Sequence, residues 1–267
     1  MRITTIIENY VSKSGLLAEH GLSFYIETEN RKILFDTGQT SAFAKNAKAL
    51  GINLSEIDAV VLSHGHFDHT GGLTSFLEIN SKATVYCKPE ALWPKYHGPK
   101  KYIGMNVPEA LLKPRLHFIS GCFQLDEGVF AIADIPLHNK ADNAFHNFQV
   151  LRNGSFEDDE FLDEVFLALV RNNKLSVISS CSHRGISNVV HKAREVFPRS
   201  QMNMVLGGFH LKDENIKQYP EIVSYLNRII PESVGTCHCS GVEMFARLKT
   251  DLTSPVFYNF TGHQINL

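Results

Sequence analysis

Four side chains of the kinds that bind transition metals lie within six residues of this sequence. His64, His66, Asp68 and His69 belong to residues 62–72, which read LSHGHFDHTGG. Imidazole and carboxylate groups are the ligands that zinc, iron and manganese accept. In an extended stretch, residues two apart point the same way, so His64 and His66 can hold one ion while the turning chain directs Asp68 and His69 at a second. The spacing therefore predicts a centre for two divalent metal ions, with zinc as the first expectation and iron or manganese as alternatives.

Two more histidines follow predicted strands directly. Residues 175–179 lead into CSHRG at 181–185, and residues 234–237 lead into HCSG at 238–241, in each case before a predicted helix. Because open α/β sheets gather functional groups at the C-terminal ends of their strands, His183 and His238 are predicted metal ligands. His210, in GGFH at 207–210, also follows a buried strand. It is interpreted either as a further ligand or as a supporting or core histidine.

Three acids near these motifs receive different interpretations. Asp36 follows a buried strand and precedes Thr37-Gly38. A carboxylate there can accept the free ring N–H of a ligand histidine and fix its tautomer, although an ordinary turn-forming aspartate is the alternative. Asp163 and Glu164 are interpreted as surface acids.

The elements that must position these residues alternate between strands and helices. Apolar runs and alternation predict strands at residues 2–8, 22–27, 32–35, 57–62, 129–132, 165–170, 175–179, 204–206, 234–237 and 256–260. Helical spacing predicts helices at residues 41–50 (ending at Gly51), 187–196, 219–230 and 241–248. This alternation predicts the α/β class. Because no low-complexity linker interrupts the pattern, residues 1–267 are predicted to form a single domain with two similar halves.

The segment at residues 89–115 differs from this alternation because prolines are interleaved with lysines and aromatic residues. It is predicted to be an irregular insertion that borders the site as a partly mobile, lid-like cover. Its aromatic side chains could stack on a ring and its lysines could meet a phosphate; the residues concerned are Trp93, Tyr96, His97, Lys100, Lys101 and Tyr102. A basic, aromatic surface loop without a ligand is the alternative.

The composition limits the classes of partner that the protein is expected to bind. The formal net charge is -2 and the pI is about 6.7, so nothing global attracts nucleic acid or an anionic membrane. No uncharged apolar run approaches the roughly 20 residues needed to cross a bilayer. Residues 1–10 do not read as a signal peptide, which predicts a cytoplasmic protein. The expected partner is a small-molecule substrate, with no nucleic acid and no membrane.

The five cysteines are odd in number and form no C-x-x-C pair, so they are expected to be reduced thiols. Cys181, Cys237 and Cys239 flank the predicted ligands. They are interpreted as small residues needed for packing and are not assigned to a metal.

Taken together, these motifs resemble those of the metallo-β-lactamase superfamily, in particular the branch of metal-dependent hydrolases and dihydropterin ribofuranosyl-aminobenzene phosphate synthases. The likeness is carried by FDTG at 35–38, HGHFDHTGG at 64–72, CSHRGI at 181–186, GGFHL at 207–211 and HCSG at 238–241. The resemblance implies a four-layer αββα sandwich. It further implies that one metal is held by His64, His66 and His183, and the other by Asp68, His69 and His238. The superfamily often places a bridging aspartate where this chain has GGFH, so the bridging ligand is not identified.

Two adjacent divalent ions turn a bound water into hydroxide near neutral pH and polarise the substrate oxygen. The sequence therefore predicts a di-metal-dependent hydrolase that uses a metal-bound hydroxide on a small phosphate-containing, pterin- or nucleotide-like substrate. Asp68 is the predicted catalytic residue, because it can orient the attacking water as well as bind metal. Three alternatives stay open: an iron-dependent redox protein, a nuclease, and a non-catalytic ligand sensor that retains metal. The absence of a basic tract makes the nuclease the weaker of these. Substrate, metal and oligomeric state are not identified by the sequence.

Overall fold

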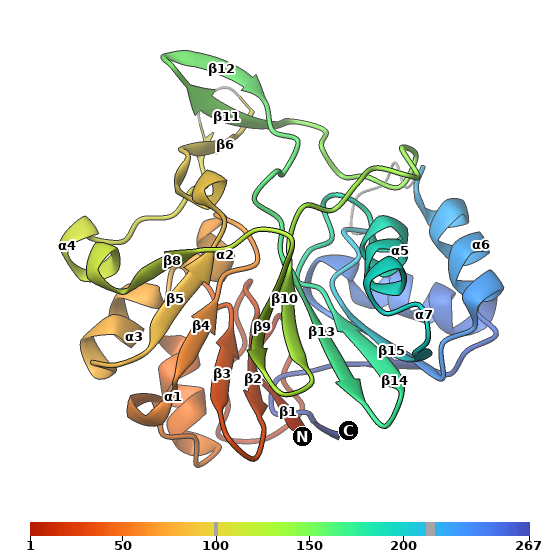
Figure 1. Ribbon diagram of the computed structural model, residues 1–267, viewed down its shortest axis with the longest axis horizontal. Helices are drawn as coiled ribbons and strands as arrows, with labels where there is room; N and C mark the ends of the chain where they lie inside the picture. The colour runs from red at the N-terminus through yellow and green to blue at the C-terminus, as the bar shows by residue number, and fades with distance from the viewer. Residues whose placement is uncertain (99–100, 212–216) are drawn as a thin grey trace. The chain divides into compact units, whose positions relative to one another are not determined.

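The computed structural model describes residues 1–98, 101–211 and 217–267 of the chain. The chain forms two compact units. Figure 1 labels most of the helices and strands. Unit 1 comprises Met1–Ile119, His146–Asp163 and Phe260–Leu267, and unit 2 comprises Ser120–Phe145 and Glu164–Asn259. Neither unit is a continuous stretch of sequence, so each depends on segments that are far apart along the chain.

Unit 1 is built on a seven-stranded mixed sheet. In spatial order its strands are β18 (Gln264–Asn266), β1 (Arg2–Ile7), β2 (Ser23–Glu27), β3 (Lys32–Phe35), β4 (Ala59–Val61), β5 (Thr84–Cys87) and β8 (Leu116–Phe118). The first part is antiparallel, whereas β3, β4, β5 and β8 are parallel. The ends of β3 and β4 therefore lie at one sheet edge, which brings Asp36 and the residues from Leu62 onward into the same region of unit 1.

The helices of unit 1 are short. They are α1 (Ala42–Ala49), α2 (Phe67–Thr70), α3 (Leu73–Ile79) and α4 (Glu109–Leu112), with 3-10 turns at Leu54–Glu56, Pro89–Leu92 and Lys113–Arg115. Helix α1 ends where the sequence predicts, because Gly51 takes the positive φ of 74° that suits a glycine after a helix. Its buried Phe43 and Ala47 pack in a core with Leu34 and Val60 of the sheet.

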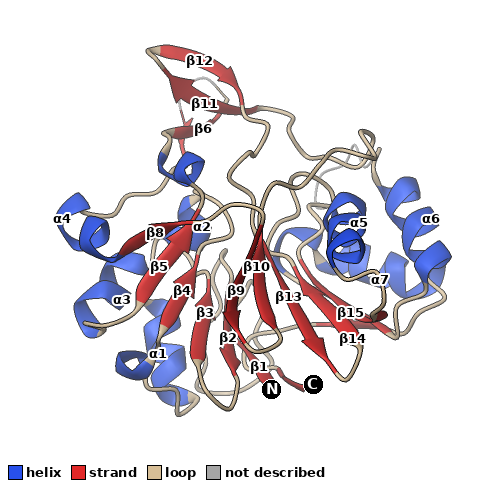
Figure 2. Cartoon of the chain, in the orientation of Figure 1, coloured by secondary structure: helices blue, strands red, loops and turns tan. Residues whose placement is uncertain are grey.

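A second sheet of unit 1 contains part of the segment at residues 89–115. Its strands run in the order β12 (Ser155–Asp158), β11 (Phe148–Arg152), β6 (Lys95–His97) and β7 (Lys101–Tyr102), all antiparallel. Figure 2 labels strands β6, β11 and β12 of this sheet. The segment is therefore regular where it forms β6 and β7, because β6 pairs with a strand about fifty residues away that no local pattern identifies. Pro99 and Lys100 lie outside the described residues.

Unit 2 contains the second seven-stranded sheet. Its order is β17 (Val256–Tyr258), β16 (Ser233–Thr236), β15 (Gln201–Gly207), β14 (Lys174–Ile178), β13 (Phe166–Arg171), β10 (Val129–Ile132) and β9 (Cys122–Asp126). Strands β14 to β17 are parallel and the others are antiparallel. The carboxyl ends of β14, β15 and β16 precede the three histidine segments of this unit, as the sequence predicts.

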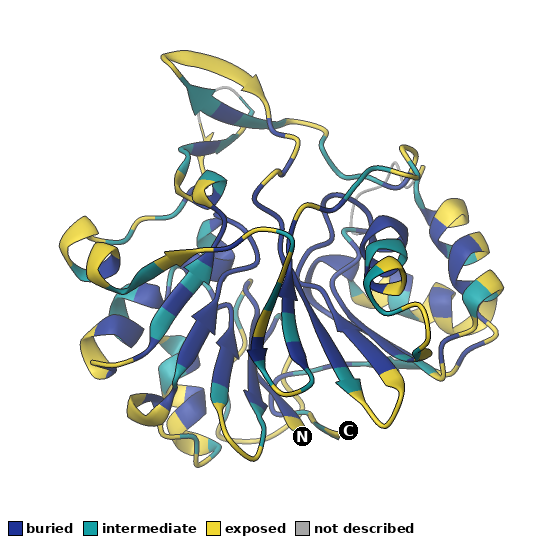
Figure 3. Cartoon of the chain, viewed as in Figure 1, coloured by how far each residue is buried: buried dark blue, intermediate teal, exposed yellow. Residues whose placement is uncertain are grey.

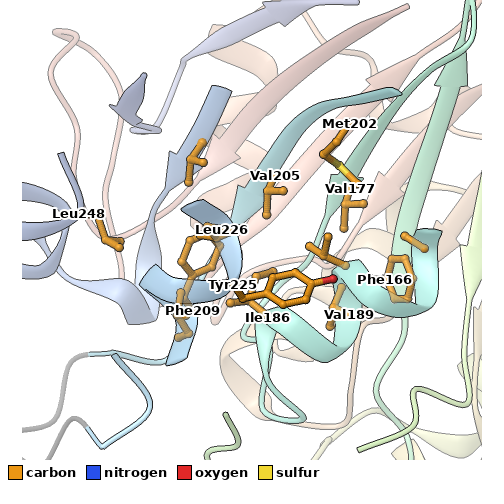
Figure 4. Close-up of a cluster of buried hydrophobic side chains, with 14 of the residues drawn as sticks. Phe166, Val177, Ile186, Val189, Met202, Val205, Phe209, Tyr225, Leu226 and Leu248 are labelled. Atoms are coloured by element: carbon orange, nitrogen blue, oxygen red, sulfur yellow. The ribbon is translucent and has the colours of Figure 1, made fainter. Parts of the chain in front are cut away.

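Three helices of unit 2 pack on its sheet: α5 (Ile186–Val196), α6 (Tyr219–Ile229) and α7 (Val242–Asp251), with a 3-10 turn at His238–Ser240. Helix α5 buries Ile186, Val189, Val190 and Ala193, the spacing of one helical face, against strand residues such as Val205 (Figure 4). Full burial of an isoleucine or valine side chain contributes roughly 1.5–3 kcal/mol. The central strands of the two seven-stranded sheets, such as β4 and β14, are largely buried, whereas β12 is exposed along its length (Figure 3).

The α/β class and all four predicted helices are confirmed. Strands β5, β8, β9, β11, β12 and β18 are not among the sequence predictions, because several are short and exposed at alternate or successive positions. Among the described residues, no helix has the length and apolar character that a bilayer-crossing segment needs.

Candidate metal centre

The four predicted ligands of unit 1 are gathered on one buried loop. It leaves β4 after Val61 and passes through His64 and His66 before the single-turn helix α2 presents Asp68 and His69. All four side chains are buried, Asp68 being the most exposed at 7%. The ring centroid of His64 lies 4.5 Å from that of His66 and 4.4 Å from that of His69. The loop thus concentrates imidazole groups in one place.

Asp36 is the residue that orients two of these rings. Its Oδ2 accepts hydrogen bonds from Ser63 Oγ at 2.7 Å and from His69 Nδ1 at 2.9 Å, and its Oδ1 accepts from Ser63 N at 2.7 Å. Because Ser63 Oγ gives its hydrogen to Asp36, it can only accept from His64 Nδ1, which lies 2.8 Å away. Both rings therefore carry hydrogen on Nδ1, and the Nε2 atom is the one suited to bind metal.

Asp68 lies next to the Nε2 side of His69. The distance between Asp68 Oδ2 and His69 Nε2 is 3.5 Å. Two ligands of one tetrahedral zinc ion, each about 2.0–2.1 Å from it, lie about 3.3–3.4 Å apart, so these two atoms fit one ion. His20 Nε2 lies 3.4 Å from the same oxygen. His20 is absent from the sequence predictions, because it stands alone in the sequence with no neighbouring ligand residue.

The charges around His69 set its protonation. Burial alone would lower the pKa of His69, but the carboxylates of Asp68 and Asp36 raise it to about 10. Since Asp36 holds the hydrogen on Nδ1, a metal ion at this residue must displace the other proton, from Nε2. The donors of this loop, histidine nitrogens and an aspartate oxygen, are a set that zinc, iron and manganese accept.

A buried ion cluster supports the same loop from its other side. Asp163 Oδ2 accepts a hydrogen bond from Gly65 N at 2.7 Å, and Asp163 Oδ1 lies 3.0 Å from Lys95 Nζ. Lys95 also donates to Asp159 at 2.6 Å and is only 1% exposed. Although burial would lower the pKa of Lys95, the two carboxylates raise it. The interpretation of Asp163 as a surface acid is wrong, since it is fully buried and holds the loop backbone.

The segment at residues 89–115 contacts this loop directly. Phe67 N donates to Ile103 O at 2.8 Å, and His66 pairs with Gly104 in an isolated bridge. A Cβ added at Gly65 would lie 2.2 Å from Ala91 O, so only glycine fits there. The segment borders the ligand loop of unit 1.

The aromatic side chains of this segment pack largely on one another and on the small sheet. Tyr96 meets Tyr102 edge to face at 5.4 Å, His97 meets Phe148 at 5.2 Å, and Trp93 lies under the Arg152 guanidinium. Lys101 and Tyr102 are exposed, whereas Lys100 lies outside the described residues. Stacking on a substrate ring remains a proposal for the exposed members only.

In unit 2, a carboxylate holds the backbone around His183. Glu164 Oε1 accepts from His183 N at 2.6 Å, and its Oε2 accepts from Arg184 N at 2.8 Å. The ring of His183 directs Nδ1 toward Ala144 O at 3.4 Å. Glu164 is 2% exposed, so its interpretation as a surface acid is also wrong. The role of Glu164 could not be predicted, because it depends on a contact with a loop nineteen residues later that no local sequence pattern reveals.

His238 lies beside two buried cysteines. One ligand atom each of Cys181, His238 and Cys239 lie within 4.8 Å of one another. All five cysteines are free thiols. The sequence predicts that these cysteines serve packing, and the structure places the sulfur atoms of Cys181 and Cys239 within 4.8 Å of a ring nitrogen of His238.

His210 lies against the ring of His183, with ring centroids 4.5 Å apart. The preceding Gly208 has no room for a side chain, because a Cβ there would lie 2.4 Å from Cys239 Sγ and 2.5 Å from Ser180 O. A bridging aspartate cannot be placed at this glycine without moving its neighbours. This packing excludes a larger residue at Gly208 in the loop after β15.

Comparison with known proteins gives the family. The model of the metallo-β-lactamase superfamily matches residues 17–158. The chain belongs to this superfamily. The 7,8-dihydropterin-6-methyl-4-(β-D-ribofuranosyl)-aminobenzene-5′-phosphate synthase of Methanocaldococcus jannaschii is 30% identical over 263 residues, which cover 90% of this chain and 88% of that protein.

A solved structure agrees over the whole length. The crystal structure of Tm1679, described as a metal-dependent hydrolase of the β-lactamase superfamily, has a TM-score of 0.87 and 32% identity, covering 100% of this chain and 99% of that one. A shorter match is a UPF0173 metal-dependent hydrolase of Staphylococcus aureus, 35% identical over 95 residues, 34% of this chain and 39% of the relative. The predicted fold of the metallo-β-lactamase type is confirmed, within a superfamily of metal-dependent hydrolases.

Proposed function

We propose that this protein is a di-metal hydrolase acting on a small phosphate-containing substrate, with zinc as the metal. The proposed ligands of one ion are His64, His66 and His183, and those of the other are Asp68, His69 and His238. His210, which contacts the His183 ring, is proposed as a lesser candidate ligand. Membership of the superfamily and the donor groups found within each unit support this assignment.

The observation that carries the proposal is the hydrogen-bond pattern around Asp36. One carboxylate fixes hydrogen on Nδ1 of His69 directly and on Nδ1 of His64 through Ser63. A histidine held in this way presents Nε2 as its metal-binding atom. A core histidine without a ligand needs no such arrangement on two neighbouring rings.

Asp68 is the proposed catalytic residue. Two divalent ions would lower the pKa of water and polarise a substrate oxygen. The carboxylate of Asp68 can accept a hydrogen bond from the attacking water and hold it in line with the substrate. Its Oδ2 already meets His69 Nε2 and His20 Nε2, so the oxygen is fixed from two sides.

The substrate class is supported by a relative and by the segment next to the loop. The Methanocaldococcus jannaschii relative is named for a product that carries a pterin and a 5′-phosphate. In this chain, Lys101 and Tyr102 are exposed on the segment that borders the ligand loop of unit 1. An ammonium group suits a phosphate, and a phenol ring suits a flat heterocycle.

Metal analysis followed by hydrolysis assays tests the proposal. Protein purified without added metal is analysed for zinc, iron and manganese, then stripped with a chelator and reloaded with each metal singly. The reloaded samples are assayed on phosphomonoester, phosphodiester, lactone and thioester panels. We expect at least two zinc ions per chain, and turnover on a phosphate ester that disappears on stripping.

A control variant checks that metal content and turnover survive a histidine substitution outside the centre. His117→Gln changes an exposed histidine outside the proposed centre and should keep full metal content and turnover. Full metal content with no turnover on any panel would favour the ligand sensor instead. Iron as the bound metal, together with electron transfer, would favour the redox protein.

A further inference from the structure

A second group of metal-binding side chains lies in unit 2, apart from the residues proposed for the hydrolytic centre. One ligand atom each of His138, His191 and Glu195 lie within 4.8 Å of one another. His191 and Glu195 are four residues apart on α5, so they share one face of the helix. His138 comes from the loop that follows β10. Neither the superfamily motifs nor the proposed hydrolysis uses any of the three.

The distances fit a single ion. Glu195 Oε1 lies 3.4 Å from His138 Nε2 and 3.3 Å from His191 Nε2. Two ligands of a tetrahedral zinc ion lie about 3.3–3.4 Å apart when each is about 2.0–2.1 Å from the metal. The ring centroids of the two histidines are 4.1 Å apart with a tilt of 48°. One carboxylate oxygen is therefore approached by two imidazole nitrogens at the separation that a shared ion requires.

The loop that carries His138 is fixed to the same helix. Asn188 Oδ1 accepts from Asn139 N at 2.7 Å, and Asn188 Nδ2 donates to Asn139 O at 2.9 Å. Asn188 is fully buried and precedes His191 by one turn of α5. The backbone next to His138 is thus held before any ion binds, which lowers the entropy cost of bringing the third ligand in.

The group borders a cavity that can supply the remaining coordination positions. The cavity has a volume of about 280 Å³, and its lining includes His138, His191, Glu221 and Arg228. The three side chains are 42% to 46% exposed, so an ion from solvent can reach them. Lys192 lies 3.9 Å from Glu195 Oε2, the other oxygen, and leaves Oε1 facing the imidazoles.

We propose that His138, His191 and Glu195 form a separate binding site for a divalent transition-metal ion, open to water or a small ligand in the adjoining cavity. Two imidazoles and one carboxylate suit zinc, iron(II), nickel or copper, and disfavour magnesium and calcium, which prefer oxygen ligands. Bound metal would tie the loop after β10 to helix α5. Residues of that loop support the His183 segment, since Asp142 accepts from Ser187 N at 2.7 Å.

Zinc binding to the full-length protein and its variants tests this site. Wild type, His138→Gln, His191→Gln and Glu195→Gln are dialysed against the same buffered free zinc, and bound zinc is measured by elemental analysis. Each variant should bind one zinc fewer than wild type and keep the ions of the hydrolytic centre. Loss of a direct ligand should weaken this site by more than the roughly 10–100-fold that loss of an outer partner costs.

Zinc-soaked crystals locate the ion independently. Anomalous scattering at the zinc edge should give a peak about 2.0–2.2 Å from the two Nε2 atoms and Glu195 Oε1. The controls are His117→Gln and Glu243→Gln, which change exposed residues outside the group and should bind zinc as wild type does. Equal zinc content in wild type and all three site variants, a loss that the controls share, or no peak at this position would overturn the proposal.

Discussion

The two units hold their proposed ligand histidines in different ways. In unit 1, Asp36 reaches the imidazole of His69 itself, and Asp163 joins the loop backbone to the buried ammonium of Lys95. In unit 2, Glu164 instead accepts from the backbone N–H groups of His183 and Arg184. The His183 ring there meets a carbonyl oxygen, that of Ala144.

In unit 1 a carboxylate acts on the charge of a ligand imidazole, whereas in unit 2 a carboxylate acts on the position of the ligand loop. A carboxylate on an imidazole favours its protonated form, as the raised pKa of His69 shows. A carboxylate on backbone N–H groups, such as Glu164, fixes the position of the loop. Changes in unit 1 are therefore expected to alter metal binding and charge balance, whereas changes in unit 2 are expected to alter mainly the stability of the ligand loop.

The largest effect is expected in unit 1, from Asp68→Asn. The change keeps size and shape but removes the charge, so the second ion should bind more weakly while the first largely stays. Metal content should fall by about one ion per chain, and turnover should fall by about 10²–10⁴-fold because a positioned proton-transfer group is lost. Elemental analysis and steady-state assays on the substrate that wild type hydrolyses measure both.

Saturating metal should not rescue Asp68→Asn. Asp58→Asn is the control, since Asp58 pairs with Lys82 at the surface of the same unit. Full turnover of Asp68→Asn would rule out the proposed role of Asp68 and would favour a one-metal or redox mechanism.

Asp163→Asn tests the charged support of the unit 1 loop. Removing this charge leaves the buried Lys95 ammonium with Asp159 as its remaining carboxylate partner. The asparagine amide can also place an NH₂ group where the Asp163 carboxylate accepts a hydrogen bond from Gly65 N. Breaking a buried ion pair typically costs about 3–5 kcal/mol, which we expect as the loss in free energy of unfolding in urea. Glu109→Gln breaks the exposed pair with Lys113 and should cost only about 0–1 kcal/mol. Equal losses in the two variants would contradict a special role for the cluster.

The supporting acids show where sequence-based prediction stops. The ligand histidines and their strand-end positions could be predicted, because the donor residues are close in sequence and follow apolar runs. The role of Asp163 depends on a contact with Gly65, which is 98 residues away. His20 likewise reaches Asp68 only through the fold. Periodicity reports which face of an element is buried, and it carries no information about which distant backbone group a buried acid meets.

Asp142→Asn in unit 2 tests how much free energy of unfolding the protein loses by using a buried carboxylate as the acceptor for Ser187 N. Burial raises the pKa of Asp142 from 3.8 to about 6, although its hydrogen bonds to Ser187 work against this. The folded protein therefore binds the proton more tightly than the unfolded chain, so stability is lost as pH rises from about 4 to 6. The loss is about 3 kcal/mol.

The variant should lack this pH dependence, because asparagine does not ionise and keeps an oxygen for Ser187 N. Urea unfolding of chelator-treated protein at pH 4 and pH 7 measures the difference. Asp158→Asn, on the exposed strand β12, should keep the wild-type slope. A wild-type slope in Asp142→Asn as well would assign the effect to another group.

The smallest effect is expected from Glu164→Gln, the unit 2 counterpart of Asp163→Asn. Glutamine keeps one oxygen for one of the two N–H groups, and its amide NH₂ faces the other, so one buried donor loses its acceptor. Such a loss costs about 1–3 kcal/mol, less than the loss expected for the charged cluster of unit 1. The same urea titration measures this loss. Glu243→Gln, exposed on α7, is the control and should stay within about 0.5 kcal/mol of wild type.

Because Glu164 holds backbone N–H groups and not an imidazole, the pH dependence of zinc binding in Glu164→Gln should stay as in wild type even where the affinity for zinc falls. A larger loss in free energy of unfolding than that of Asp163→Asn, or a shifted pH profile of zinc binding, would show that Glu164 acts on the charge of His183. The carboxylates of the two units would then control imidazole charge in the same way.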